Sequence, residues 1–158
     1  MISIFIPGVP VAKGSPRMMV NRRTGKPFPG KDSEKLVAWE RVARAYATTA
    51  MHGREMFDCP VVLCASFVFP RPKSHLGKDG NVLPSKPKRY TAKPDLDKLM
   101  RALGDCLNGI VYRDDSQILS CTLHKQYENE NLGLCIGTLV EVEMMFDLFV
   151  PVRRFTGR

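Results

Sequence analysis

The chain has 158 residues, 44% of them hydrophobic and 25% charged, values that suit a single folded domain with its own apolar core. No apolar run approaches the ~20 residues of a membrane-spanning helix. The sequence lacks the Gly-x-x-x-x-Gly-Lys-Ser/Thr motif of a phosphate-binding loop, so we expect no nucleotide cofactor. The net charge of +8 favours a polyanionic partner such as nucleic acid, although solubility alone also explains a basic surface. The 5 cysteines lack Cys-x-x-Cys spacing, which predicts free thiols, mostly in the core of a cytoplasmic protein.

The first part of the chain predicts a strand, a loop and a helix. Residues 2–6 are rich in β-forming side chains, and residues 7–31 form a loop rich in Pro, Gly and basic residues. Asp32 or Ser33 is placed to cap a helix that extends to about Met51, and Gly53 suits its end. The face of this helix predicted to be buried contains Leu36, Ala43, Tyr46, Ala47 and Ala50, with Trp39 near its edge.

The middle of the chain predicts a buried strand, a long basic loop and a second helix. Residues 61–69 are almost continuously apolar, which predicts a central strand buried on both faces. Residues 71–94 form a basic loop expected to be flexible until a polyanion neutralises it. Residues 95–107 predict a helix with leucines along one side and Asp97, Arg101 and Asp105 along the other.

Two strands are predicted after this helix, at residues 117–127 and 138–147, joined as an antiparallel hairpin by a polar turn. Val140, Val142, Met144 and Phe146 share one face of the second strand. The order strand–helix–strand–helix–strand–strand predicts an α+β fold, an α/β sandwich in which helices pack on a mixed sheet. We expect one domain over residues 1–158, with a basic tail at residues 151–158.

Two pairs of acids stand out in this basic chain: Asp95 with Asp97, and Asp114 with Asp115. Each has a structural explanation of its own. Asp95 is placed to cap the second helix, and Asp97 is placed to pair with Arg101 one turn later. Asp114 and Asp115 suit a polar turn before a strand.

Taken together, the four acids favour a divalent cation. The second helix and the following strand are sequential and expected to pack together, so their acids can converge. Four carboxylates so close would repel one another unless a cation lay among them, and carboxylate oxygens are the ligands that Mg²⁺ prefers. A basic surface with an acidic centre is typical of an enzyme that hydrolyses a phosphate backbone.

The same region carries a resemblance to a known family. The run KPDLDKLMRALGDCLNG at residues 93–109, followed by DDSQI at residues 114–118, resembles the signature of the RusA family of Holliday junction resolvases. The family pattern is K-P-D-x-D-N-L-x-K-A-x-x-D-A-L-N-G, a short gap, and D-D-x-Q-I. Further similarity lies in residues 70–75, PRPKSH, and in Gly8, Pro10, Lys13, Gly14, Pro16 and Arg17.

The resemblance implies a Mg²⁺-dependent endodeoxyribonuclease, with Mn²⁺ as a substitute, that acts as a homodimer in a bacterial or phage-infected cell and nicks four-way DNA junctions symmetrically. By motif position, Asp95, Asp97 and Asp115 match the acids that hold the metal, and Asp114 matches a supporting acid. Asp105 matches a further aspartate that recurs in the family. The first strand and the first helix are both candidates for the dimer surface.

Two positions depart from the family pattern. Lys98 stands where the family usually has Asn, and Arg101 stands where it has a catalytic Lys. Arginine stays charged at any working pH, so Arg101 cannot shuttle a proton, but it can stabilise charge on a phosphate oxygen, with Lys98 beside it.

DNA contacts are expected from basic residues on both sides of the acids, although any one of them also suits a solvated surface. The candidates are Lys13, Arg17, Arg22, Arg23, Lys73, Lys86, Lys88, Arg89, Lys93 and Lys98. Two alternatives stay open: a nuclease for other branched DNA such as forks and flaps, and a non-catalytic junction-binding protein with a degenerate site.

Overall fold

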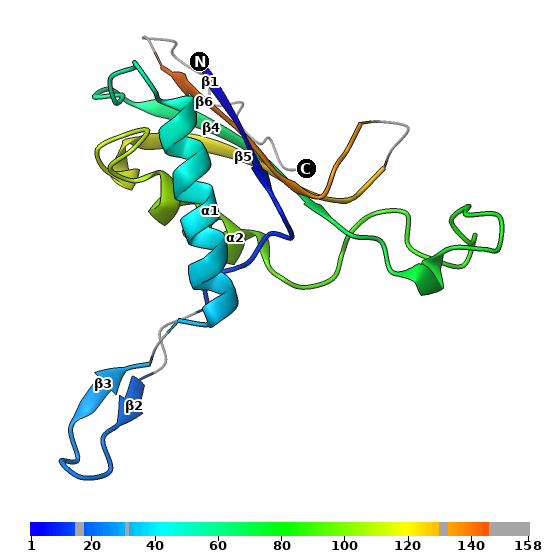
Figure 1. Cartoon of the computed structure of the whole chain (residues 1–158), viewed down its shortest axis with the longest axis horizontal. Helices are drawn as coiled ribbons and strands as arrows, with labels where there is room; N and C mark the ends of the chain where they lie inside the picture. The colour runs from blue at the N-terminus through cyan, green and yellow to red at the C-terminus, as the bar shows by residue number, and fades with distance from the viewer. Residues whose placement is uncertain (15–17, 31, 130–132, 146–158) are drawn as a thin grey trace, which may run out of the picture.

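The structure, a computed structural model, describes residues 1–14, 18–30, 32–129 and 133–145. One mixed four-stranded sheet has the strand order β1-β6-β4-β5, and a separate two-stranded hairpin lies beyond the N-terminal end of the first helix, away from the sheet (Figure 1). The strands of the sheet are β1 (Ile2–Pro7), β4 (Val61–Phe69), β5 (Ile118–Tyr127) and β6 (Gly137–Met144). The α+β class is confirmed. The predicted roles of Arg17, Phe146 and the tail 151–158 fall outside the described residues.

Two helices, α1 (Glu34–Ala50) and α2 (Leu96–Leu107), cover one face of the sheet. Alternation puts Ile2, Ile4 and Ile6 of β1 into the core, and Val140 and Val142 of β6 join them there. The helices pack against each other, α1 also against β1 and α2 also against β5. The core therefore lies between one helical layer and one sheet.

The ends of α1 follow from its sequence. Ser33 is the N-cap, because its Oγ accepts a hydrogen bond from the Leu36 N–H at 3.2 Å, and Gly53 follows the helix with a φ of 72°. Trp39 is buried as the helical spacing suggested. Tyr46 is 45% exposed, so the prediction that it joins the core was wrong: it lies beside the buried stripe rather than on it.

The predicted hairpin between the last two strands was also wrong. β4 lies between them, parallel to β5 and antiparallel to β6. β4 is the most apolar strand, so a central position with neighbours on both sides buries more of it than an edge would. Its parallel pairing with β5 requires a crossover connection, and α2 lies within that connection.

The prediction that β4 is buried on both faces holds only for its last part. Phe67, Val68 and Phe69 are buried, but Cys64 is exposed on the face that carries no described helix. Of the cysteines, only Cys106 is buried and Cys59 is half-buried, so the expectation that most of them line the core was wrong.

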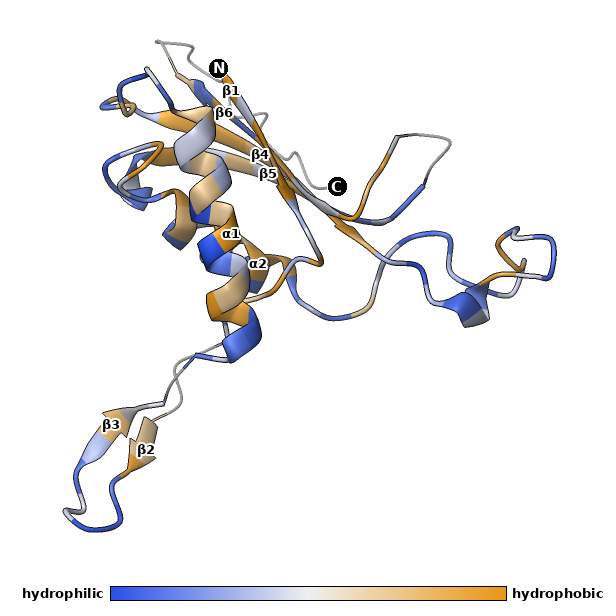
Figure 2. Cartoon of the chain, viewed as in Figure 1, coloured by the Kyte–Doolittle hydropathy of each residue, from blue (hydrophilic) through white to orange (hydrophobic). Residues whose placement is uncertain are grey.

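The loop predicted at residues 7–31 contains the projecting hairpin, β2 (Met18–Val20) and β3 (Pro27–Pro29). Its turn is formed by Asn21, whose side chain accepts hydrogen bonds from the N–H groups of Arg23 and Thr24. Figure 2 shows that β2 is apolar, that β3 is mixed and that the turn is hydrophilic. Strands of three residues around prolines give too weak a periodic pattern to be read from sequence.

Across the described part of the chain, neither helix combines the length and the apolar character that crossing a bilayer requires.

The contact between α2 and the sheet provides a test of this core. Leu103 of α2 is fully buried, so Leu103→Ala should lower the free energy of unfolding by about 3 kcal/mol, because it leaves a cavity between the two layers. Val37→Ala, at a position that is 45% exposed on α1, is the control and should change it by much less. Urea unfolding followed by circular dichroism measures both. Equal losses would contradict this arrangement of the layers.

Candidate functional site

Asp95 precedes α2 at the N-cap position but makes no capping hydrogen bond. Its Oδ2 instead accepts a hydrogen bond from Lys98 Nζ at 2.7 Å, one turn into the helix. Asp95 therefore occupies the predicted N-cap position, but its side chain does not cap the helix. Its carboxylate is exposed and lies on the surface beside Lys98.

Asp97 lies in the first turn of α2 and is exposed. It forms no hydrogen bond or ion pair with any described residue, so the predicted pairing with Arg101 is not found. Arg101 is also exposed, one turn further along the helix. Asp97 therefore interacts with the described chain only through the nearby charge of Lys98.

Lys98 stabilises the ionised form of Asp95. The hydrogen bond and the positive charge of Lys98 hold the pKa of Asp95 below its ordinary value, and the charges of Lys93 and Lys125 act in the same direction. In return, Asp95 raises the pKa of Lys98. The acid stays ionised and the lysine stays protonated throughout the physiological range.

The two acids of the second pair, Asp114 and Asp115, differ in their contacts. Asp114 caps the short 3₁₀ turn η2 (Asp115–Gln117), because its side chain accepts a hydrogen bond from the Ser116 N–H at 2.9 Å. The polar-turn interpretation is thus confirmed for Asp114. Asp115 is exposed and its carboxylate makes no hydrogen bond or ion pair with a described residue.

Gln117 explains why this turn has a fixed position. Its Oε1 accepts hydrogen bonds from the N–H groups of Arg113 and Asp114 at 2.8 and 3.0 Å. Its Nε2 donates to the carbonyl oxygens of Phe57 and Cys59, both at 3.0 Å. One amide side chain therefore fastens the acidic turn to the loop that precedes β4.

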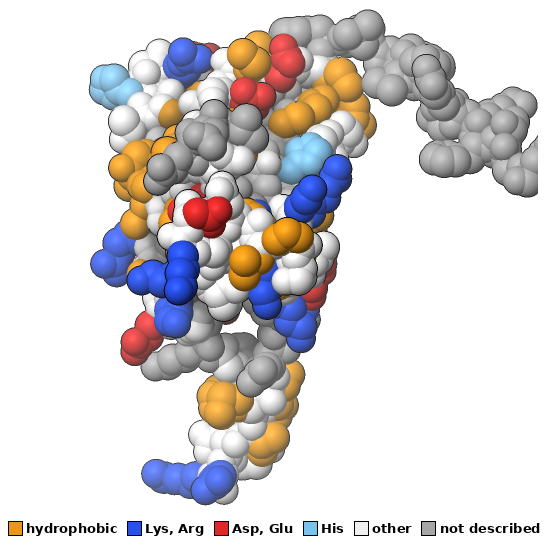
Figure 3. All heavy atoms as spheres, turned by 90° about the vertical axis from the view of Figure 1, so that its right-hand side faces the viewer, with side chains coloured by type: hydrophobic (Ala, Val, Ile, Leu, Met, Phe, Trp, Pro, Cys, Tyr) orange, Lys and Arg blue, Asp and Glu red, His pale blue; other side chains and the backbone are white. Residues whose placement is uncertain are grey.

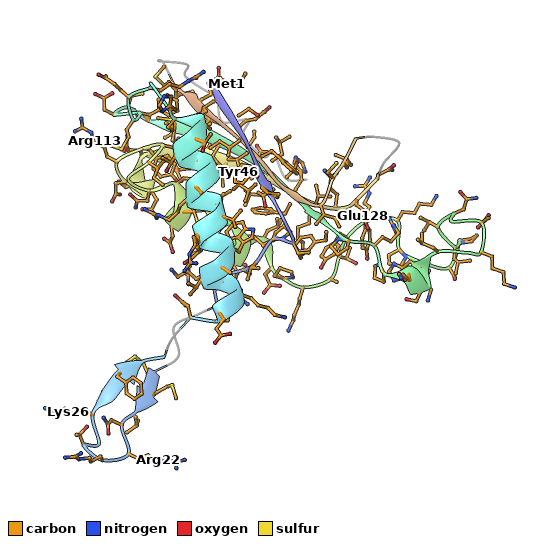
Figure 4. All side chains as sticks on the ribbon, viewed as in Figure 1. Met1, Arg22, Lys26, Tyr46, Arg113 and Glu128 are labelled. Atoms are coloured by element: carbon orange, nitrogen blue, oxygen red, sulfur yellow. The ribbon has the colours of Figure 1, made fainter. Side chains whose placement is uncertain are left out.

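The two acid pairs do not meet within one chain. The segment before Asp95 lies against Lys125, near the end of β5, whereas Asp115 lies just before the start of β5. Between them α2 has 12 residues, a length of about 18 Å. Figure 4 shows Arg113 and Glu128, which flank the two ends of β5, on opposite sides of the molecule.

Accordingly, in residues 1–14, 18–30, 32–129 and 133–145 no three His, Cys, Asp or Glu side chains come close enough together to hold a metal ion. The expected convergence of four carboxylates is not found in a single subunit. The pair Asp95 and Asp97 still suits Mg²⁺, which binds proteins through one or two carboxylates together with substrate phosphates.

Lys13 and Asp105 form an ion pair that the sequence did not predict. Lys13 Nζ lies 2.9 Å from Asp105 Oδ2 and 3.7 Å from Glu40 Oε1, and the Lys13 N–H donates to the Lys98 carbonyl oxygen at 3.1 Å. Asp105 accordingly raises the pKa of Lys13. Lys13, a candidate for DNA contact, thus fixes the N-terminal loop to α2, and Asp105 has its partner there.

The other basic candidates lie on two projections. Arg22 and Arg23 are exposed at the turn of the hairpin, where Figures 3 and 4 show basic side chains at its tip. The long loop carries the second group, Lys73, Lys86, Lys88, Arg89 and Lys93. A shallow pocket of about 300 Å³ lies where this loop meets β5, lined in part by Lys88 and Arg89.

Sequence reasoning missed the residues that hold this loop. Arg71 donates from its guanidinium to the carbonyl oxygens of Pro87 and Lys88, at 3.0 and 3.1 Å, and lies over the Tyr127 ring. Lys125 holds the segment before Asp95. Arg71 belongs to the PRPKSH run and could have been noticed there, whereas nothing in the sequence marks Lys125.

An α+β domain with basic projections and unpaired surface carboxylates has the features of a protein that acts on a phosphate polyanion. The sequence matches the family described as Endodeoxyribonuclease RusA over residues 7–137, and the chain belongs to that family. It is also 31% identical over 136 residues to the uncharacterised protein YqaN of Bacillus subtilis (strain 168), a match that covers 82% of this chain and 89% of that protein. Family membership indicates an endodeoxyribonuclease.

The ion pair at the start of α2 is open to direct test. Lys98→Met should raise the pKa of Asp95 toward its ordinary value, because the hydrogen bond from Lys98 is the largest cause of its depression. A carboxylate is ionised above its pKa, so Asp95 in the variant should take up its proton at a higher pH. Carbon-detected NMR titration in metal-free buffer measures this, with Lys35→Met as the control. An unchanged pKa in Lys98→Met would contradict the pairing.

Proposed function

We propose that this protein is a Mg²⁺-dependent endonuclease that resolves four-way DNA junctions by paired, symmetric nicks. The observation that carries the proposal is the state of the acids at the start of α2: the side chain of Asp95 pairs with Lys98 instead of capping the helix, and Asp97 makes no hydrogen bond or ion pair with a described residue. Exposed carboxylates at one helix start, between two basic projections, support chemistry on a phosphate backbone.

In the proposed reaction, water adds to the phosphorus and the bond to the 3′ oxygen breaks, which leaves a 5′-phosphate and a 3′-hydroxyl. Asp95, Asp97 and Asp115 would hold the cation, with Asp114 fixing the turn that carries Asp115. When bound, Mg²⁺ supplies positive charge at the phosphate and makes a nearby water more acidic. Arg101 and Lys98 would stabilise the charge on the non-bridging oxygens.

The basic projections would grip the DNA backbone. Arg22, Arg23 and the cations of the long loop lie on different sides of α2, so they can contact separate arms of a branched substrate. Contacts to phosphates position DNA without reading its sequence. This arrangement supports selection by DNA shape.

A homodimer would complete the acidic site. β5 is an edge strand of 10 residues, and its residues Leu119–Thr122 are exposed. Such an edge is a template for pairing with a second strand. If two copies of β5 pair antiparallel around a two-fold axis, the start of one lies beside the end of the other.

Such a dimer would bring together acids that lie far apart within one subunit. Asp115 precedes the start of β5, and Asp95 with Asp97 lies near its end, so each Asp115 would lie toward Asp97 of the partner subunit. We propose that each metal site takes acids from both subunits. The two sites would then face two strands of a junction, as paired nicking requires.

Cleavage of labelled DNA tests the activity. Wild-type protein with Mg²⁺ should place paired symmetric nicks in a four-way junction and leave linear duplex intact. Asp97→Asn should lower the rate by about 100-fold or more, since even residues outside the ligand set cost 10–100-fold. Glu143→Gln, at an exposed acid of β6, which β4 separates from β5, should have no such effect.

Other outcomes would redirect the proposal. Cleavage of forks or flaps in preference to junctions would keep the chemistry and change the substrate. Tight junction binding without a cut in Mg²⁺ or Mn²⁺ would overturn the catalytic proposal and leave a structure-specific binding protein.

Mixed dimers test the shared site. Asp97→Asn and Asp115→Asn should each be inactive alone, but an equal mixture after subunit exchange should regain about a quarter of the intact sites, because half the dimers are mixed and each has one intact site. Its product should be single nicks rather than paired ones. If the mixture stays inactive although wild-type protein cuts, each site is built within one subunit.

A further inference from the structure

The segment at residues 90–94 leads from the basic loop to the acids of α2, and two side chains hold it. Three successive carbonyl oxygens in this segment each accept a side-chain hydrogen bond. Lys125 Nζ donates to Ala92 O at 2.8 Å and to Pro94 O at 2.7 Å, and the Tyr90 hydroxyl donates to Lys93 O at 2.7 Å. Pro94 is followed directly by Asp95, so the second of these bonds ends one peptide away from the acidic pair.

Lys125 makes these bonds from a paired position in the sheet. It lies in β5 opposite Phe67 of β4, and its Nζ lies 5.4 Å from the centre of the Tyr90 ring. Tyr90 in turn stacks on Phe69, with ring centres 4.3 Å apart. The ammonium group therefore contacts two main-chain oxygens and one aromatic ring.

Lys125 makes its hydrogen bonds to the main chain, although its charge also helps to lower the pKa of Asp95. Within the described residues it forms no ion pair, and two of its three N–H donors serve the main chain. Charge-assisted hydrogen bonds are stronger than neutral ones, and an ammonium can donate to two carbonyl groups at once. A neutral side chain of similar length could not hold both ends of this segment.

Arg71 also holds the basic loop, at residues that come earlier in the chain. Arg71 holds Pro87 and Lys88, which precede Tyr90, so it cannot fix the backbone next to Asp95. Among the described side chains, only Lys125 and Tyr90 donate to the carbonyl groups of residues 92–94.

We propose that Lys125 is a positioning residue that fixes the entry to α2 from β5, so that Asp95 and Asp97 present their carboxylates to a divalent cation in one arrangement. This inference rests on the proposed function. Metal ligands must lie within narrow distances, and a segment free to move would have to be ordered each time the cation binds. Residues that orient ligands from outside the ligand set typically contribute 10–100-fold to metal affinity.

Three variants separate this role from a general one. Lys125→Met keeps the length of the side chain and removes its donors, whereas Lys125→Arg keeps the charge and can donate to two carbonyl groups. Lys35→Met removes the same charge from an exposed position on α1 and is the matched control. If Lys125→Met does not fold, Lys125→Gln, which retains a neutral donor, takes its place with the same expectation.

Two measurements on the protein without DNA come first. Hydrogen exchange of the amides at residues 91–97 should become faster in Lys125→Met, while the exchange of β4 and β6 stays as in the wild type. Mn²⁺ binding, measured by electron paramagnetic resonance with the metal alone, should weaken by about tenfold. Lys125→Arg should restore most of both properties, and Lys35→Met should change neither.

Cleavage kinetics complete the test. The Mn²⁺ concentration for half-maximal rate should rise by about tenfold in Lys125→Met, with a smaller change in the rate at saturating metal. Unchanged exchange at residues 91–97 together with unchanged Mn²⁺ binding would overturn the inference. A wild-type protein that binds no Mn²⁺ and cuts no junction would overturn the proposed function, whatever the exchange of Lys125→Met.

Discussion

The parallel pairing of β4 with β5 constrains the rest of the molecule. Parallel neighbours require the chain to return along the whole sheet between them, and α2 makes this return. The start and the end of α2 therefore lie at opposite ends of β5. One acid pair lies at the start of α2 and the other lies between α2 and β5. The parallel pairing of β4 with β5 therefore places α2 over the core and also separates the carboxylates that the chemistry would use.

The positive charge of this protein is used in two ways. Some cations face solvent on the hairpin and the loop, where they are available to a polyanion. Others pair with groups of the protein itself and hold segments that are neither helix nor strand. These are Lys13, Arg71 and Lys125. The net charge alone would assign all of these residues to DNA, whereas the hydrogen bonds show that several hold the scaffold on which the acids are displayed.

Local patterns predicted the local structure well. Both helices were correctly placed, because their apolar periodicity and signals such as the Ser33 cap and Gly53 act within a few residues of the chain. Strand pairing was predicted wrongly, because β5 and β6 are neighbours in sequence while the apolar character of β4 brings it between them. The candidate acids were recognised by motif, but their separation depends on the direction of α2, which no spacing reveals. Lys125 could not be identified, since a lone lysine on a strand resembles any solvated lysine.

The hairpin formed by β2 and β3 has a further consequence for how the protein meets its target. Its short strands expose Met18, Met19, Val20 and Phe28 to water, with a cationic turn at the end. A two-stranded ribbon of this size has little stability of its own in water. A surface that covers the apolar side of this arm would therefore contribute to the stability of the arm as well as to the affinity of the complex. The heat capacity change on binding should then exceed the value expected for two rigid bodies.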